Sequence, residues 1–176
     1  MAEIRVRVWR VGRRSDSRYL LILRDNSGNP LGMVIGPCEA VAIWAVLRRA
    51  QDRPHATEDH PEQGRGAVLR KGPEEPLSRI PATHDLLDAM LTRLGGKLEK
   101  VVVDDLWNGT YYAKLHVTVD GQRTTVDGRP SDCVALALRA HAPLYVTEEV
   151  MAASREPDSP SDLDGDADPL AGLEEL

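Results

Sequence analysis

The sequence predicts an α+β domain in which a strand-strand-strand-helix-(strand)-helix unit occurs twice, giving a mainly antiparallel sheet packed by helices. Three observations support this prediction. Segments with the residue pattern of β-strands come in two groups of three. Each group is followed by an apolar segment that begins with proline, and the two groups align without a gap. The chain of 176 residues, 41% of them hydrophobic, is long enough for one domain with a buried core.

The first group of strands is predicted from alternation and turn residues. Residues 4–11 alternate apolar and basic side chains, residues 19–24 form a second extended run, and residues 30–35 follow a polar turn. A strongly apolar helix then begins at Pro37 and reaches about Arg49, with proline at the first helical position, where its missing N–H removes no hydrogen bond. We expect a helix this apolar to be buried.

The second group of strands follows a helix that Thr83 is expected to cap and that ends at two glycines. Asn108-Gly109 and Asp120-Gly121 are expected to form tight hairpin turns, since both dipeptides tolerate a positive φ. Thr147 is expected to cap the last helix. The predicted elements are a helix at 84–94, strands at 98–107, 111–119 and 122–127, a buried helix at 133–141, a strand at 143–146 and a helix to about residue 154.

The two groups align with an offset of 93 positions, which indicates an internal duplication. Beyond the first helix the offset becomes 64, and the difference, 93 − 64 = 29, equals the length of residues 51–79. That segment is rich in Pro, Gly and charged residues, and we interpret it as a mobile insertion in the first copy. The offset of 93 pairs Tyr19 with Tyr112, Gly28 with Gly121, Pro37 with Pro130, Glu39 with Asp132 and Val41 with Val134.

The distribution of charge divides the chain into a domain at 1–153 and an acidic tail at 154–176, which we expect to be disordered. The tail holds eight acidic residues and one arginine, so its net charge is 1 − 8 = −7 and that of the domain is −6 + 7 = +1. Most nucleic-acid-binding domains are more basic than this. One basic patch stands near the start of the chain, and solvated strand positions are its favoured explanation. It consists of Arg5, Arg7, Arg10, Arg13 and Arg14.

The sequence contains no recognisable signal peptide and no apolar run of transmembrane length, so we expect a cytoplasmic protein that does not associate with a membrane. Cys38 and Cys133 are then expected to be free thiols, because disulfides are rare in a reducing compartment. Aromatic residues make up only 4% of the chain, so platforms for stacking bare bases are scarce.

Five segments of the chain resemble, in the same order, the signature blocks of the bifunctional nuclease domain family. The resemblance covers roughly residues 1–152. It implies a small intracellular α+β domain, a homodimer, and hydrolysis of both DNA and RNA. The segments are IGPCEA (35–40), PATHDLL (81–87), DLWNGTYYA (105–113), DGRPSDCVALALR (127–139) and PLYVTEEV (143–150).

The candidate site residues follow from the chemistry of phosphodiester cleavage. That reaction generally needs carboxylates that hold a divalent cation such as Mg²⁺ or Mn²⁺, and a cation or histidine near the phosphate. Glu39 and Asp132 are candidate catalytic residues and metal ligands, because equivalent acids of a duplicated fold can meet near its axis. His84 and Asp85 are further catalytic candidates. Arg129, beside a helix N-terminus, is the candidate phosphate-binding residue.

Each candidate also has a purely structural explanation. Glu39 and Asp132 fall at the third helical position, where a carboxylate favours the helix dipole and can cap a backbone N–H. Arg129 can form an ion pair with Asp127 or with a carboxylate of the other copy. Ser131 lacks the context of a nucleophile and is interpreted as a residue of the helix start.

The leading functional hypothesis from the sequence is metal-assisted hydrolysis of DNA and RNA with low sequence specificity. Two alternatives stay open, because a fold hosts many functions: a non-catalytic dimeric binding or regulatory module, and a pathway-specific enzyme that acts on a small metabolite. A convergent polar pocket favours the small metabolite, whereas a flat surface or an open basic groove favours nucleic acid.

Overall fold

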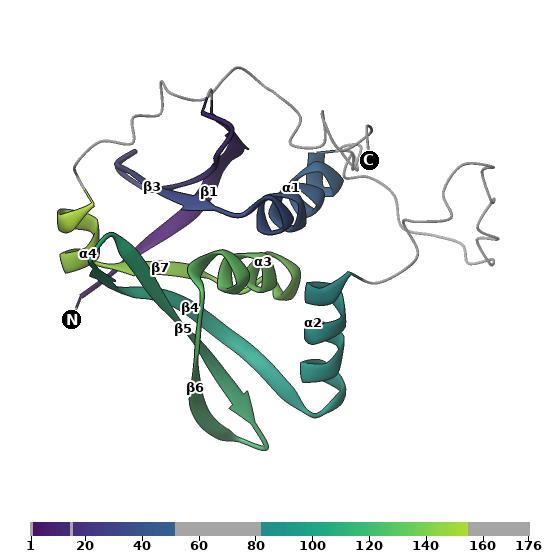
Figure 1. The fold of residues 1–176 in the computed structure, drawn as a ribbon. Helices are drawn as coiled ribbons and strands as arrows, with labels where there is room; N and C mark the ends of the chain where they lie inside the picture. Colours follow the sequence, from purple (N-terminus) through teal and green to yellow (C-terminus); the bar gives the residue numbers. More distant parts are fainter. Residues whose placement is uncertain (1, 15, 52–81, 155–176) are drawn as a thin grey trace, which may run out of the picture.

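Seven strands in the described part of the chain form one sheet, and its helices lie mainly on one face of that sheet (Figure 1). The computed structural model describes residues 2–14, 16–51 and 82–154. The strands are β1 (Glu3–Arg13), β2 (Tyr19–Asp25), β3 (Pro30–Ile35), β4 (Gly96–Trp107), β5 (Thr110–Val119), β6 (Gln122–Gly128) and β7 (Leu144–Thr147). The helices are α1 (Pro37–Gln51), α2 (Thr83–Arg93), α3 (Pro130–Ala140) and α4 (Glu148–Ala153).

The strand order across the sheet is β3-β2-β1-β7-β4-β5-β6. All neighbouring strands are antiparallel except β7 and β4, which are parallel. The short strand β7 connects the two groups of three strands, since it pairs Val146 with Ile4 of β1 and Tyr145 with Val102 of β4. The predicted α+β class with a mainly antiparallel sheet is therefore confirmed.

The two strand triplets have the same internal order, with the first strand beside β7 and the third strand at an edge of the sheet. Hairpin turns set this order in the second triplet. Asn108 and Asp120 have φ values of 49° and 50°, and the glycines that follow them, Gly109 and Gly121, have φ values of 74° and 77°. Two consecutive residues with positive φ are the geometry of a type I′ turn, as the dipeptides predicted.

Helix α3 supplies the centre of the core, whereas α1 is less buried than its composition predicted. Val134, Ala135 and Ala137 of α3 are completely buried in the main hydrophobic cluster, together with residues of β1, β2, β4 and β7. In α1, only Ala40 and Ile43 are buried among the residues whose burial is described. The expectation of a buried α1 was wrong, because this helix contacts α3 and the first strands along one stripe and leaves its other apolar side chains half exposed.

The two predicted threonine caps had different outcomes. Thr147 caps α4 as predicted, because its hydroxyl accepts a hydrogen bond from the N–H of Val150 at 3.4 Å. Thr83 does not cap α2, which begins one residue earlier than predicted with Ala82 as the N-cap. The Asp85 carboxylate instead accepts a hydrogen bond from the Ala82 N–H at 2.9 Å. A carboxylate at the third helical position thus satisfies the backbone N–H of the residue that precedes the helix.

Helix α2 packs on α3 but has no buried residue. Its exposed apolar side chains are those of Leu86, Leu87 and Met90, and Leu94 at its C-cap is also exposed. Within the described ranges, no helix is long and apolar enough to cross a membrane. The predicted insertion and tail, apart from Gln51 and Ser154, lie outside the described residues.

Packing of α1 against the sheet can be tested by comparing one buried and one exposed side chain. Ile43→Ala is expected to lower the free energy of unfolding by about 2 to 5 kcal/mol, because Ile43 is completely buried and its loss leaves a cavity. Leu86→Ala on the exposed face of α2 is expected to change it by less than about 0.5 kcal/mol. Urea unfolding of both variants measures the difference. Equal costs for the two substitutions would contradict this packing.

Candidate functional site

Two carboxylates from the two halves of the chain meet at one guanidinium. Arg129, the N-cap residue of α3, places its Nη2 2.7 Å from Oε1 of Glu39 and its Nε 2.7 Å from Oδ2 of Asp132. Glu39 lies in the first turn of α1 and Asp132 in the first turn of α3. The pairing of Glu39 with Asp132 by the offset of 93 thus corresponds to proximity in space, with Arg129 bridging the two acids.

Local backbone geometry explains why the three side chains converge. A residue before proline is held in an extended conformation, and Arg129, which precedes Pro130, has φ −66° and ψ 137°. On the other helix, Gly36 precedes Pro37 and makes room for the Glu39 carboxylate. A Cβ at position 36 would lie 2.3 Å from Oε2 of Glu39, so a larger residue there would displace this carboxylate.

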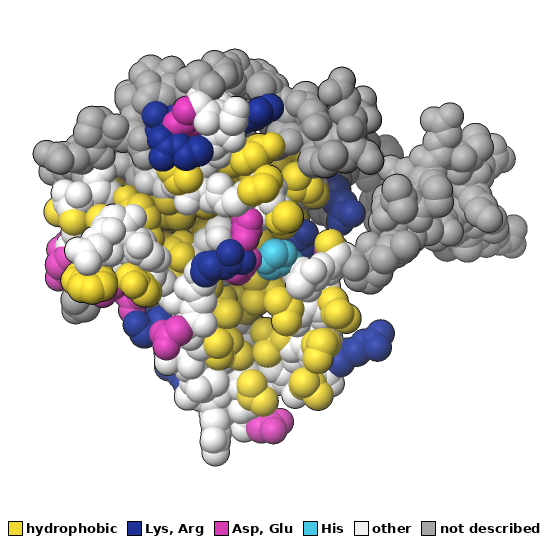
Figure 2. Space-filling model, in the orientation of Figure 1, with side chains coloured by type: hydrophobic (Ala, Val, Ile, Leu, Met, Phe, Trp, Pro, Cys, Tyr) yellow, Lys and Arg dark blue, Asp and Glu magenta, His cyan; other side chains and the backbone are white. Residues whose placement is uncertain are grey.

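His84 completes the group from the first turn of α2. Its Nε2 lies 3.2 Å from Oδ1 of Asp132, and only 12% of its side chain is exposed, against 69% for Arg129. Glu39, His84, Arg129 and Asp132 are called the Arg129 cluster below. Figure 2 shows basic, acidic and histidine side chains together in the middle of the helix-bearing face, with hydrophobic side chains around them. The cluster is therefore accessible from solvent mainly through Arg129.

The guanidinium of Arg129 lies beside two carboxylates, those of Glu39 and Asp132. The hydrogen bond to Asp132, together with the charges of Asp132 and Glu39, raises the pKa of the Arg129 guanidinium further above its usual value. Arg129 is therefore protonated at every physiological pH. Its positive charge lies between the two carboxylates, and Asp132 accepts hydrogen bonds from two sides.

The arrangement of the two acids fits a guanidinium better than a divalent cation. Arg129 occupies the position between Glu39 and Asp132 that a shared metal ion would need. The described segments contain no group of three or more His, Cys, Asp or Glu side chains placed to hold a metal ion. Binding of Mg²⁺ or Mn²⁺ by these two acids would require Arg129 to move away.

Comparison with known proteins identifies the family. The profile of the bifunctional nuclease domain matches residues 69–159. Two curated proteins of Mycobacterium tuberculosis, from strains CDC 1551 and H37Rv, are each 34% identical to this chain over 152 residues, which is 86% of this chain and 75% of theirs. The chain belongs to the bifunctional nuclease domain family. Both relatives are described as uncharacterised proteins, so they carry no assigned activity.

The profile match of the bifunctional nuclease domain includes three members of the Arg129 cluster, His84, Arg129 and Asp132, but not Glu39. Glu39 comes from the first half of the chain and reaches the cluster through α1. The cluster therefore depends on both halves of this bifunctional nuclease domain protein.

Asp85, the fifth predicted site residue, is held away from the cluster by an ion pair with Arg139. Its Oδ1 lies 2.5 Å from Nε of Arg139, which is 7% exposed and also donates to the carbonyl oxygens of Ala42, at 3.1 Å, and Ala135, at 2.9 Å. Burial alone would raise the pKa of Asp85, but the hydrogen bonds from Arg139 and the Ala82 N–H outweigh it, so this pKa is lowered. Asp85 and Arg139 thus connect α2, α3 and α1.

The other polar candidates lie outside the cluster. Asp127 forms a 3.8 Å ion pair with Lys114, and Ser131 is buried at the start of α3. Cys133 is buried, and burial raises the pKa of its thiol to about 12, so it remains protonated and packs as a small apolar residue. Cys38 is exposed, and both cysteines are free thiols as predicted.

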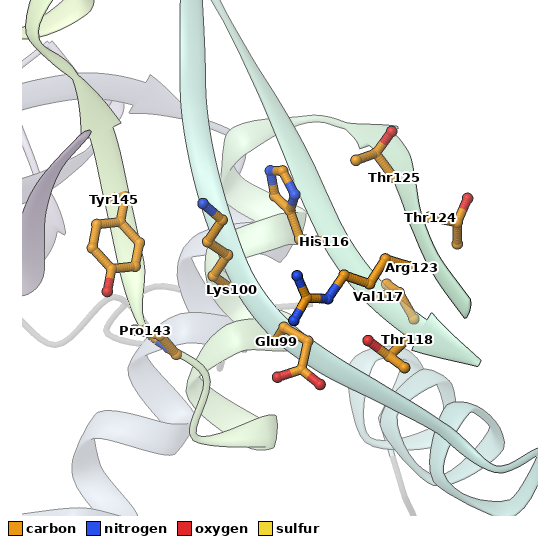
Figure 3. A pocket seen from close by; sticks show the side chains of 10 residues that line it. All are labelled: Glu99, Lys100, His116, Val117, Thr118, Arg123, Thr124, Thr125, Pro143 and Tyr145. Atoms are coloured by element: carbon orange, nitrogen blue, oxygen red, sulfur yellow. The ribbon is translucent and has the colours of Figure 1, made fainter. Parts of the chain in front are cut away.

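Sequence reasoning missed a polar pocket on the opposite face of the sheet, lined mainly by residues of β4, β5, β6 and β7 (Figure 3). Lys100 and His116 are cross-strand partners in this lining, and Arg123 reaches it from the edge strand. The only signal in the sequence is that polar residues alternate with apolar ones along β5, from Ala113 to Val119. That pattern marks a solvent-facing side but does not show that the side is hollowed.

The ion pair of Asp85 with Arg139 predicts a pH-dependent stability. Because the folded-state pKa of Asp85 lies below its usual value of 3.8, its contribution is fully present above about pH 5 and is lost as the pH falls through the folded pKa. Asp85→Asn is expected to lower the free energy of unfolding by about 1 to 3 kcal/mol at pH 7, since Arg139 loses a charged hydrogen-bond partner. At pH 3 the variant and the unmodified protein should differ much less.

Urea unfolding at pH 7 and pH 3 measures this difference. Asp88→Asn on the same helix is the matched control, because Asp88 forms no ion pair within the described residues. A cost for Asp85→Asn that does not change between the two pH values would show that the carboxylate charge is not what stabilises this contact.

Proposed function

We propose that this protein hydrolyses phosphodiester bonds of DNA and RNA, with low sequence specificity, at the Arg129 cluster. The observation that carries the proposal is the position of Arg129, an exposed guanidinium at a helix N-terminus that is held by two carboxylates and lies beside a histidine-aspartate pair. The family supports the same activity. A guanidinium and the N-terminus of a helix both provide N–H donors to phosphate oxygens.

Arg129 is the proposed phosphate-binding residue. A guanidinium has five N–H donors, and the contacts of Arg129 with Glu39 and Asp132 leave others for a phosphate oxygen. The exposed fraction of its side chain, 69%, allows a strand to approach from solvent. The two carboxylates hold the guanidinium in one orientation before the substrate binds, and such preorganised donors stabilise the charge that develops on the phosphate.

His84 and Asp132 are the proposed proton-transfer pair. With Nε2 of His84 donating to Asp132, the neutral ring leaves Nδ1 as an acceptor. In the proposed reaction a water oxygen forms a bond to phosphorus, its proton moves to Nδ1, and the bond from phosphorus to the leaving oxygen breaks. The imidazolium then returns a proton to the leaving oxygen, so the histidine ends in its starting state.

Metal assistance by Mg²⁺ or Mn²⁺ is the other form of the proposal. It requires Glu39 and Asp132 to exchange Arg129 for the cation, which would then supply the positive charge at the phosphate. The two forms differ in whether Arg129 or a metal ion is the essential cation, and a chelator separates them.

A pathway-specific enzyme that acts on a small metabolite is the second candidate function. The polar pocket on the opposite face of the sheet favours it, because small molecules bind in concave sites with a few convergent polar groups.

A cytoplasmic location and a homodimer also remain predictions, the homodimer being what the family resemblance implied.

We further propose that the two halves of the chain arose by internal duplication. Support comes from the same strand order in both triplets, from the helix that follows each triplet at Pro37 or Pro130, and from the meeting of Glu39 with Asp132 at Arg129. A site formed where the two copies meet then requires residues from both copies.

Cleavage of a single-stranded oligonucleotide tests the proposed function. Asp132→Asn and Arg129→Gln are each expected to lower the cleavage rate at least ~10²-fold, because each removes charge stabilisation or proton transfer from the transition state. Arg93→Gln, which changes an exposed arginine of α2 outside the cluster, is the matched control and should leave the rate unaltered. Circular dichroism establishes that the variants are folded.

The chelator EDTA separates the two forms of this proposal. If Arg129 is the essential cation, cleavage persists in EDTA and is lost in Arg129→Gln. If a metal ion is essential, EDTA stops cleavage and added Mn²⁺ restores it. If Asp132 is only a helix cap, Asp132→Asn costs about 0.5 to 2 kcal/mol of stability at most and leaves the rate unchanged, which contradicts the proposed site.

A further inference from the structure

The side of the sheet on which no helix of the described residues packs carries a polar pocket of about 700 Å³, shown in Figure 3. Its position follows from the alternation of side chains along the strands. Leu144 and Val146 are buried in the main core, so Tyr145 between them points to the other face, where it lines the pocket. The pocket and the Arg129 cluster therefore lie on different faces of the molecule.

Lys100 stands at a fixed position in this pocket. Its Nζ lies 2.7 Å from both carboxylate oxygens of Glu3 on β1 and 5.7 Å from the centre of the Tyr145 ring. The ammonium group has three donors, so the ion pair holds the side chain in place without using all of them. Its neighbour Glu99 forms its own ion pair, at 2.9 Å, with Lys97 outside the pocket lining.

Arg123 is the second cation of the lining and comes from the exposed edge strand β6. Within the described ranges its guanidinium forms no hydrogen bond and no ion pair, although its charge acts on Glu99. Figure 3 shows the Arg123 side chain extending from β6 across the pocket toward Glu99 and Lys100. This leaves a planar group with five donors available to a ligand.

Uncharged polar groups surround the two cations. Thr118 and Thr125 contribute hydroxyl groups, and His116 contributes a ring that is half-buried. Burial, and then the charge of Lys100, lower the pKa of His116, while Glu3 and Asp104 act in the opposite direction. The ring is therefore neutral at pH 7 and offers one donor and one acceptor instead of a charge.

We propose that this pocket binds the phosphate ester of a nucleotide-sized molecule, with Arg123 and Lys100 on the phosphate. Arginine, lysine and threonine donors are the groups that recognise phosphate oxygens. The volume lies within the range of roughly 300 to 1,000 Å³ that is usual for small-molecule sites, so it accommodates an organic group as well as the phosphate. The ligand is either a free mononucleotide or the terminal phosphate of a strand, and the proposal does not depend on cleavage at the Arg129 cluster.

Calorimetric titration of the full chain with uridine 5′-monophosphate tests the proposal. The mononucleotide is expected to bind, whereas uridine, which lacks the phosphate, is not. Arg123→Gln should weaken binding at least ~10-fold because it removes the bidentate donor, and Thr125→Val should weaken it less. Arg93→Gln is the matched control for loss of one exposed arginine and should bind as the unmodified protein does. Titration with a 5′-phosphorylated dinucleotide then shows whether a strand end binds as well as the free mononucleotide.

Two results would overturn the proposal. One is the absence of any binding of the mononucleotide or the phosphorylated dinucleotide. The other is binding that survives Arg123→Gln but is lost in Arg129→Gln, which would place the phosphate at the Arg129 cluster. Since every readout is a binding constant, failure here is distinguishable from failure of the cleavage experiment.

Discussion

The four-residue strand β7 is the constraint on which the rest of the structure depends. It pairs with β1 on one side and β4 on the other, and so turns two groups of three strands into one sheet. One sheet gives α1 and α3 a common surface, on which they pack against each other. The beginnings of these helices then lie close enough for Arg129 to contact both Glu39 and Asp132.

The Arg129 cluster consists of partly exposed ion pairs that link α1, α2 and α3. An exposed pair contributes little to stability, because water and salt screen it. Here the same contacts hold a guanidinium at a helix N-terminus and link His84 to it through Asp132. In the proposed reaction they fix the phosphate donors and the proton acceptor. In the proposed reaction Arg129 would supply the positive charge that many nucleases take from a metal ion.

Much of the fold, and the meeting of Glu39 with Asp132, could be predicted from the sequence because they follow from local signals and from the alignment of the two halves. Proline at a helix start, two turn dipeptides and the pairing of Glu39 with Asp132 are readable in the chain itself. The partner of Asp85 was not predictable, since Arg139 reaches it only through the packing of α2 on α3. The partial exposure of α1 and the pocket beside Lys100 depend on packing and sheet curvature, which hydrophobic periodicity does not encode.

The proposed role of Arg129, held by two carboxylates, is to bind the phosphate as its cation. A crystal structure of the protein with a non-cleavable single-stranded oligonucleotide, grown in the presence of Mn²⁺, tests it most directly. We expect a phosphate oxygen within hydrogen-bond distance of the Arg129 guanidinium, with Glu39 and Asp132 still in contact with that guanidinium. Mn²⁺ bound between the two carboxylates with Arg129 displaced, or a strand bound away from this cluster, would contradict it.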